Sequence, residues 1–255
     1  MTYISFPVSV TAETVFSAQS KIIGGGADNP AAFILKGIIM DNNTIFSYVD
    51  HTKLAATSTL DEIRTLCDEA IRYNTASVCI PPCYIGTVKK EYPSLNICTV
   101  IGFPLGYSTT EAKVFETKDA VAKGADEIDM VINICLVKNK QFDAVLEEIK
   151  AIRSACGGKL LKVIVETCYL TDDEKVKLCQ LVTEAGAEFI KTSTGFGTAG
   201  AKAEDIVIFK ENIGADVKIK AAGGIRTKED MVNFIELGCS RIGASSAVKA
   251  LTEEV

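Results

Sequence analysis

Short runs of β-branched and apolar residues alternate with longer segments of helical periodicity from residue 46 onward, and this alternation constrains the fold most strongly. Such a pattern predicts a parallel sheet whose strands are joined by covering helices. Eight strands are expected, over residues 46–52, 77–81, 97–104, 127–133, 161–167, 189–193, 217–222 and 241–244. Eight units of this kind favour an α/β fold of the (β/α)8 TIM-barrel type. An open doubly wound sheet is the alternative, but no GxGxxG sequence follows the first strand.

The intervening segments carry signals for the beginnings and ends of helices. Helices are expected over residues 60–73, 110–123, 141–155, 171–185, 203–212 and 228–237. Three of them begin at a threonine that is followed three residues later by an acidic residue, as in a capping box: Thr59, Thr171 and Thr227. Three end at a glycine, which can adopt the left-handed conformation that turns the chain into the next strand: Gly124, Gly186 and Gly238.

The length and composition fit a single barrel domain over residues 46–255 with an N-terminal extension over residues 1–45. A chain of 255 residues that is 47% hydrophobic is long enough for one domain of this fold. The extension contains the glycine run 24–26 and an apolar stretch at 31–40, which Lys36 interrupts. That stretch is too short to span a bilayer, so we expect an arm or helix that packs against the barrel.

The charge balance and the cysteines narrow the classes of partner and cofactor. With 27 basic and 33 acidic residues the net charge is −6, so neither nucleic acid nor an anionic membrane is an expected partner. A small phosphorylated substrate needs only a few local donors and stays possible. Nine cysteines without a secretory leader indicate free thiols in a reducing, cytoplasmic compartment. With a single histidine, His51, and no paired CxxC sequence, neither a metal nor a cofactor is expected.

Charged residues interrupt strands that should be almost entirely apolar in a parallel barrel. The interruptions are Asp129, Lys162, Glu166, Lys191, Lys218 and Lys220. Because side chains alternate across a strand, we expect this set to face the barrel interior, where charges must pair with one another. Lys162, Glu166 and Lys218 fit purely structural ion pairs as well as chemical roles. Lys191 and Lys220 precede small-residue turns, where the active face of a barrel begins.

Two neighbouring lysines and a carboxylate suggest a specific chemistry. Each ammonium group disfavours the charge on the other, so one amine can be neutral near pH 7 and attack a carbonyl carbon. Asp129 could then move protons during the formation of the imine and of its enamine. Lys191, Lys220 and Asp129 are therefore the components that a metal-free aldolase requires.

Glycine- and serine-rich turns follow the last three expected strands, at residues 192–195, 221–224 and 243–246. In barrels, the loops after the seventh and eighth strands often bind a phosphate group. Glycines let backbone N–H groups approach the phosphate oxygens, and Ser245 or Ser246 could donate a hydrogen bond. The three turns together favour a phosphate-binding site.

Seven segments, in order from about Tyr48 to Ser246, resemble the deoxyribose-phosphate aldolase family. They are DHTKL at 50–54, ASVCI at 76–80, ADEIDMV at 125–131, LKVIVET at 161–167, FIKTSTG at 189–195, KAAGGIR at 220–226 and GASS at 243–246. The resemblance implies reversible cleavage of 2-deoxy-D-ribose 5-phosphate to D-glyceraldehyde 3-phosphate and acetaldehyde. It also implies that Lys191 forms the Schiff base and that Asp129 and Lys220 transfer protons.

The same resemblance implies a set of substrate-binding residues. They are Asp50, Thr52, Thr194, Gly195, Gly223, Gly224, Gly243, Ser245 and Ser246. A structural turn is the competing interpretation for Asp50 and Thr52. Two departures from the family pattern are Phe196, where some members carry a lysine, and the absence of a tyrosine from residues 251–255. We therefore expect weaker phosphate binding and slower enolisation.

Two other functions are weighed against the aldolase. One is a phosphosugar isomerase on the same barrel, in which carboxylates act and the lysines only stabilise charge. The other is a catalytically weak sugar-phosphate-binding protein that keeps the pocket. A homodimer or a higher homo-oligomer is possible for all three functions.

Overall fold

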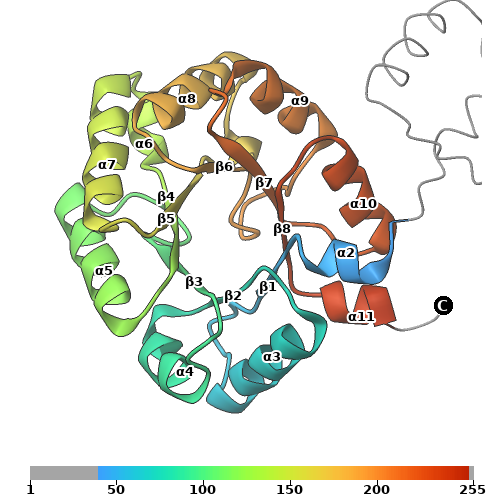
Figure 1. Ribbon diagram of the computed structural model, residues 1–255. Coiled ribbons are helices and arrows are strands. Elements are labelled where there is room, and N and C mark those ends of the chain that lie inside the picture. The colour runs from blue at the N-terminus through green and yellow to red at the C-terminus, as the bar shows by residue number, and fades with distance from the viewer. Residues whose placement is uncertain (1–39, 253–255) are drawn as a thin grey trace, which may run out of the picture. The chain divides into compact units, whose positions relative to one another are not determined.

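Eight parallel strands close into a barrel in the order of the sequence (Figure 1). The computed structural model describes residues 40–252. Each strand pairs with the next one, and β8 pairs with β1. The strands are β1 Val49–Thr52, β2 Ser77–Ile80, β3 Ile97–Ile101, β4 Glu127–Val131, β5 Leu160–Ile164, β6 Phe189–Lys191, β7 Lys218–Ala222 and β8 Arg241–Ala244. The predicted (β/α)8 barrel is confirmed.

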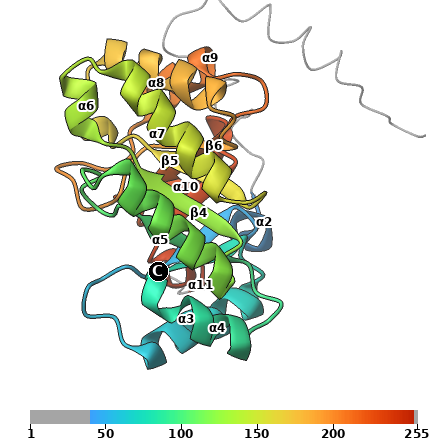
Figure 2. The same ribbon diagram turned by 90° about the vertical axis from the view of Figure 1, so that its left-hand side faces the viewer.

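Helices surround the ring of strands, and α5, α7 and α8 lie side by side on its outer wall (Figure 2). The six predicted helices are α3 Leu60–Tyr73, α5 Thr110–Lys123, α7 Phe142–Ala155, α8 Asp172–Glu184, α9 Ala203–Asn212 and α10 Lys228–Glu236. Their bounds differ from the predicted ones by one residue at most. The remaining elements are shorter: α2 Asn42–Phe46, η2 Pro82–Tyr84, α4 Ile85–Glu91, α6 Ile134–Lys138, η3 Thr167–Tyr169 and α11 Ala247–Thr252.

The predicted helix boundaries have the expected hydrogen bonds and backbone conformations. Thr59, Thr171 and Thr227 each form a reciprocal capping box with the acidic residue three positions later. Such a box satisfies two N–H groups that the first helical turn leaves unpaired. Gly124 and Gly238 adopt φ angles of 108° and 110°, in the left-handed region that glycine tolerates best, and turn the chain toward β4 and β8. These caps fix where each strand enters the barrel.

The main hydrophobic core lies between the strands and the helices. Ile128, Met130 and Ile190 alternate with the charged strand residues and are fully buried in this core. Inside the barrel a separate small apolar cluster contains Cys79 and Cys98, and the space beside it is filled by charged side chains. The alternation along each strand therefore places the apolar residues toward the helices and the ionisable residues inside the barrel.

Part of the predicted extension over residues 1–45 lies outside the described residues, which start at Met40. The described portion includes α2, whose Ile45 and Phe46 are buried in the core. The ring of Phe46 stacks on that of Tyr73 in α3, with centroids 4.8 Å apart. Among residues 40–252, no helix is both long and apolar enough to cross a membrane.

Candidate active site

Lys191 and Lys220 lie opposite each other on neighbouring strands β6 and β7. The Nζ atoms of both lysines donate hydrogen bonds to the same atom, Oδ2 of Asp129 on β4, at 2.8 Å for Lys191 and 2.7 Å for Lys220. All three side chains are buried. The structure therefore brings together the two lysines and the acid that were predicted from the sequence.

The other carboxylate oxygen of Asp129 is also paired. Its Oδ1 accepts hydrogen bonds from Nζ of Lys162 at 2.8 Å and from Sγ of Cys98 at 3.1 Å. Burial alone would raise the pKa of Asp129, but Lys162, Lys191 and Lys220 together hold it well below its usual range. Burial opposes the charge on Lys220 as well, yet Asp129 and Asp50 raise the pKa of that lysine. At neutral pH, Asp129 is therefore ionised and Lys220 is protonated.

A second layer of charge lies deeper in the barrel. The carboxylate of Asp50 accepts hydrogen bonds from Lys220, from Ser77 and from Arg241, and Glu127 is paired with both Lys162 and Arg241. Glu127 and Arg241 were not identified from the sequence. Each stands two residues before a predicted site residue on the same strand, Asp129 and Gly243, so the alternation of side chains was the signal that could have identified them.

A cavity of about 800 Å³ opens at the carboxyl ends of the strands. Of the three predicted catalytic residues, only Lys191 lines it. The predicted substrate-binding residues that line it are Thr52, Thr194, Gly195, Gly223, Gly224, Gly243 and Ser245. Asp50 does not line the cavity: it is fully buried and paired with Lys220, so its carboxylate is not turned toward this space.

Two of the predicted turns lie next to each other in the cavity wall, one with Gly195 and one with Gly223. Gly223 has a φ angle of 82°, and a Cβ atom there would lie 3.1 Å from Cα of Gly200 and 3.4 Å from Cα of Gly195. Only glycine fits such a close approach of backbones without strain. Ser246 stands beside the cavity, with its Oγ atom 3.4 Å from the carbonyl oxygens of Ile225 and Arg226.

Glu166 fixes the turn after β6. Strand β5 ends at Ile164, two residues earlier than Glu166, which adopts a left-handed φ of 57°. Its carboxylate accepts hydrogen bonds from the backbone N and the hydroxyl of Thr194, and the hydroxyl oxygen of Thr194 accepts one from the backbone N of Phe196. Phe196 lines the cavity mouth, and its ring meets that of Phe103 edge to face at 5.3 Å. Two aromatic rings therefore lie together at the position where some family members carry a charged lysine.

The prediction that Lys218 faces the barrel interior was wrong. Lys218 is exposed, and its Nζ lies 5.9 Å from the ring centroid of Phe189. It is the first residue of β7, at the amino-terminal edge of the barrel, where a long side chain reaches solvent while its strand neighbour Lys220 stays buried.

Two groups of buried side chains have atoms close enough to hold a metal ion. They are Cys79, Cys98 and Asp129, and Asp50, Cys98 and Glu127. In both groups the ammonium of Lys162 already contacts members: Nζ lies 2.8 Å from Asp129 Oδ1, 3.2 Å from Cys98 Sγ and in an ion pair with Glu127. A bound cation would have to displace this ammonium, so these donors do not fit a metal ion.

The fold and this site define a (β/α)8-barrel enzyme whose pocket, at the carboxyl ends of the strands, is lined by a buried lysine. The model of the DeoC/LacD family aldolases matches residues 44–249, and the chain belongs to that family. Its similar relatives are deoxyribose-phosphate aldolases, and the chain is an aldolase of that type. A deoxyribose-phosphate aldolase of Clostridium botulinum (strain Alaska E43 / Type E3) is 59% identical over 216 residues, which cover 84% of this chain and 98% of the relative.

Two further similar proteins are also deoxyribose-phosphate aldolases. A deoxyribose-phosphate aldolase of Streptococcus pyogenes serotype M4 is 57% identical over 219 residues, covering 84% of this chain and 97% of the relative. A solved deoxyribose phosphate aldolase from Aeropyrum pernix, described as a unique tetrameric structure, superimposes with a TM-score of 0.78 at 31% identity. That match covers 83% of this chain and 91% of the other.

Proposed function

We propose that this enzyme cleaves 2-deoxy-D-ribose 5-phosphate to D-glyceraldehyde 3-phosphate and acetaldehyde, and catalyses the reverse condensation, through a Schiff base on Lys191. The single observation that supports this most is the position of Lys191. Its Nζ shares one carboxylate oxygen with Lys220, but only Lys191 lines the cavity. A carbonyl carbon in the cavity can be reached by that amine and not by its buried neighbour.

Lys220 and Asp129 prepare the nucleophile. Lys220 is held protonated by two carboxylates, and its ammonium shares the Oδ2 atom of Asp129 with the amine of Lys191. The neutral amine of Lys191 attacks the aldehyde carbon C1 of the open-chain sugar, and loss of water gives the iminium ion. Asp129, which is held ionised, stabilises that cation through its Oδ2 atom.

The iminium ion then withdraws electrons from the C2–C3 bond. Loss of the C3 hydroxyl proton breaks that bond, releases the three-carbon aldehyde phosphate and leaves an enamine on Lys191. Protonation at C2 and hydrolysis release acetaldehyde and free the amine. We assign the proton transfers to the Lys220 and Asp129 pair, because their 2.7 Å hydrogen bond joins an acid to the oxygen that also contacts Lys191.

We assign the phosphate group to the glycine turns that follow β6 and β7 and to the carboxyl end of β8. Residues Gly195, Gly223 and Gly224 adopt positive φ angles on the cavity wall, and Gly243 and Ser245 line the same space. Backbone N–H groups at such turns bind phosphate oxygens without a basic side chain. This arrangement suits a chain in which Phe196 takes the place of a lysine.

We also propose a homo-oligomer and a cytoplasmic location. The Aeropyrum pernix relative is described as tetrameric, and light scattering after size exclusion would give the mass of this protein in solution. All nine cysteines are free, which suits a reducing compartment. A mass equal to a single chain would contradict the first assignment.

Product analysis tests the proposed reaction. Proton NMR of the enzyme with 2-deoxyribose 5-phosphate is expected to show acetaldehyde and D-glyceraldehyde 3-phosphate in equal amounts. With unphosphorylated 2-deoxyribose the rate is expected to fall, because the glycine turns lose their ligand. Conversion of the substrate to an isomeric sugar phosphate, with no acetaldehyde, would instead support the isomerase. Tight binding without any product would support a binding protein.

A further inference from the structure

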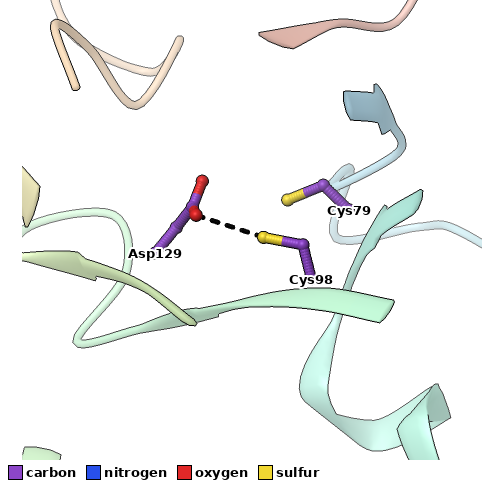
Figure 3. A group of neighbouring side chains, drawn as sticks. All are labelled: Cys79, Cys98 and Asp129. Carbon is purple, nitrogen blue, oxygen red and sulfur yellow. Dashed lines mark hydrogen bonds between the residues drawn. The ribbon is translucent and has the colours of Figure 1, made fainter. Parts of the chain in front are cut away.

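A pair of cysteines lies inside the barrel, next to the carboxylate of the proposed site (Figure 3). Cys79 on β2 and Cys98 on β3 are partners in the parallel register, and both side chains are fully buried. Their Sγ atoms and an oxygen of Asp129 all lie within 4.8 Å of one another. Figure 3 shows both sulfur atoms on the same side of the strands as Asp129.

We propose that Cys79 and Cys98 are an oxidative modification site, at which peroxide forms a reversible disulfide that lowers aldolase activity by disturbing Asp129. Neighbouring strands in a sheet are about 4.8 Å apart, which lies within the range of Cα separations that a disulfide can bridge. The proposed bond is argued from the register of the two strands, which makes the two cysteines direct neighbours. Its effect on activity rests on the proposed function of Asp129.

The reaction balances with peroxide as the oxidant. The Cys79 thiolate attacks one peroxide oxygen, the O–O bond breaks, and Cys79 becomes a sulfenic acid as water leaves. The Cys98 sulfur then displaces the sulfenic oxygen as a second water, so that two thiols and one peroxide give a disulfide and two waters. Burial raises the pKa of Cys98 well above its usual range, and the S–H group of Cys98 already donates to Asp129. Cys79 is therefore the sulfur that attacks first.

Oxidation would change the contacts of Asp129 directly. In the reduced protein the Cys98 thiol donates to Oδ1 of Asp129 at 3.1 Å, and Nζ of Lys162 contacts the same sulfur at 3.2 Å. A disulfide carries no S–H group, so Asp129 would lose this donor, and the Cys98 sulfur would move toward Cys79. The carboxylate that contacts Lys191 and Lys220 would then settle in a different position.

Leu54 separates this pair from the cavity. Its side chain packs against the cluster of Cys79, Cys98 and Val100, and it also lines the cavity. A small peroxide can reach the thiols when this side chain moves, whereas a larger disulfide reagent is excluded. Leu54→Ala is therefore expected to increase the rate of oxidation several-fold.

Peptide mapping tests the bond itself. Cys83 lies on the same tryptic peptide as Cys79, since no lysine or arginine separates them, so the experiment uses the full chain in a Cys83→Ser background. After treatment with hydrogen peroxide in the presence of a chelator, and blocking of the remaining thiols, mass spectrometry is expected to find the Cys79 and Cys98 peptides joined. A linkage between other cysteines, or only irreversible sulfinic acid at these two, would overturn the proposal.

Activity in parallel samples tests the consequence. Peroxide is expected to lower kcat about tenfold, as for loss of a hydrogen bond to a buried charge, and dithiothreitol is expected to restore it. Cys79→Ala should keep its basal activity and resist peroxide, whereas Cys135→Ser, which removes an exposed thiol, should remain sensitive. If Cys79→Ala loses activity as fast as the parent, the effect on activity is refuted. A joined peptide without any activity change would refute the role of Asp129 while leaving the disulfide established.

Discussion

Lys162 and Lys191 contact the same carboxylate but belong to two different regions of the barrel. Lys162 lies in the closed interior, where Asp129, Glu127 and Asp50 surround its fully buried ammonium. Lys191 has Asp129 as its carboxylate partner and lines the open cavity. A lysine that several carboxylates hold protonated in a closed interior cannot attack a carbonyl carbon, whereas a lysine that lines a cavity can meet one there. The surroundings, not the residue type, therefore separate structural from reactive lysines.

The largest expected effect comes from Lys191→Arg, which keeps the positive charge and removes the proposed nucleophile. We expect kcat/KM for deoxyribose 5-phosphate to fall about 10⁴-fold or more, because no covalent intermediate can form. Lys175→Arg is the matched control, since Lys175 is also buried and paired, with Asp205, but lies on α8 outside the barrel. Substantial residual turnover of Lys191→Arg would mean that the lysine acts only through its charge.

The next largest effect is expected for Asp129→Asn. The amide keeps the shape of the side chain but loses the charge that three ammonium groups share. We expect kcat to fall about 10³-fold, as for removal of a proton-transfer group, while KM changes little. Steady-state kinetics separate the two parameters, and a change confined to KM would place Asp129 in substrate binding instead.

Lys162→Met tests the closed region through stability. Removing this ammonium leaves Asp50, Glu127 and Asp129 with fewer partners, and breaking such a buried network costs about 3–5 kcal/mol. Urea unfolding measures the change in the free energy of unfolding. Lys123→Met, which removes a solvent-exposed pair with Asp119, is expected to cost less than about 1 kcal/mol. Equal decreases in the free energy of unfolding for the two variants would show that the interior network stabilises the fold no more than a surface ion pair does.

The smallest effect is expected in the part of the cavity wall that we propose binds the phosphate group. Gly223→Ala introduces a Cβ atom 3.1 Å from Cα of Gly200 at a φ angle of 82°, so the turn must shift. We expect KM for the phosphorylated substrate to rise about tenfold with little change for 2-deoxyribose. Gly86→Ala in α4, where the space around the Cβ is open, is the control and should leave KM unchanged. An equal rise in KM for both substrates would show that the phosphate group does not bind at this wall.

Most of the fold could be predicted because its signals are local. Alternation of side chains placed Asp129 and Lys220 inside the barrel, and capping residues placed the ends of the long helices. The shorter helices, such as α4 and α6, lacked such signals. The burial of Lys218 was predicted wrongly because a two-residue period gives the face of a strand but not the depth in the barrel.

The site was predicted less completely than the fold, for a different physical reason. The three predicted catalytic residues come together, but the pairing of Asp50 with Lys220 depends on how eight strands are staggered around the barrel. That stagger brings Arg241 to both Asp50 and Glu127 across the interior. Contacts between residues about 190 positions apart follow from the closure of the barrel and from no local pattern.

Trapping of the imine tests the central claim most directly. The enzyme is incubated with acetaldehyde, reduced with borohydride, digested and analysed by mass spectrometry. The account predicts a two-carbon adduct on Lys191 and none on Lys162 or Lys220, whose ammonium groups are held by buried carboxylates. An adduct on either of those lysines, or an unmodified protein that still releases acetaldehyde from deoxyribose 5-phosphate, would contradict it.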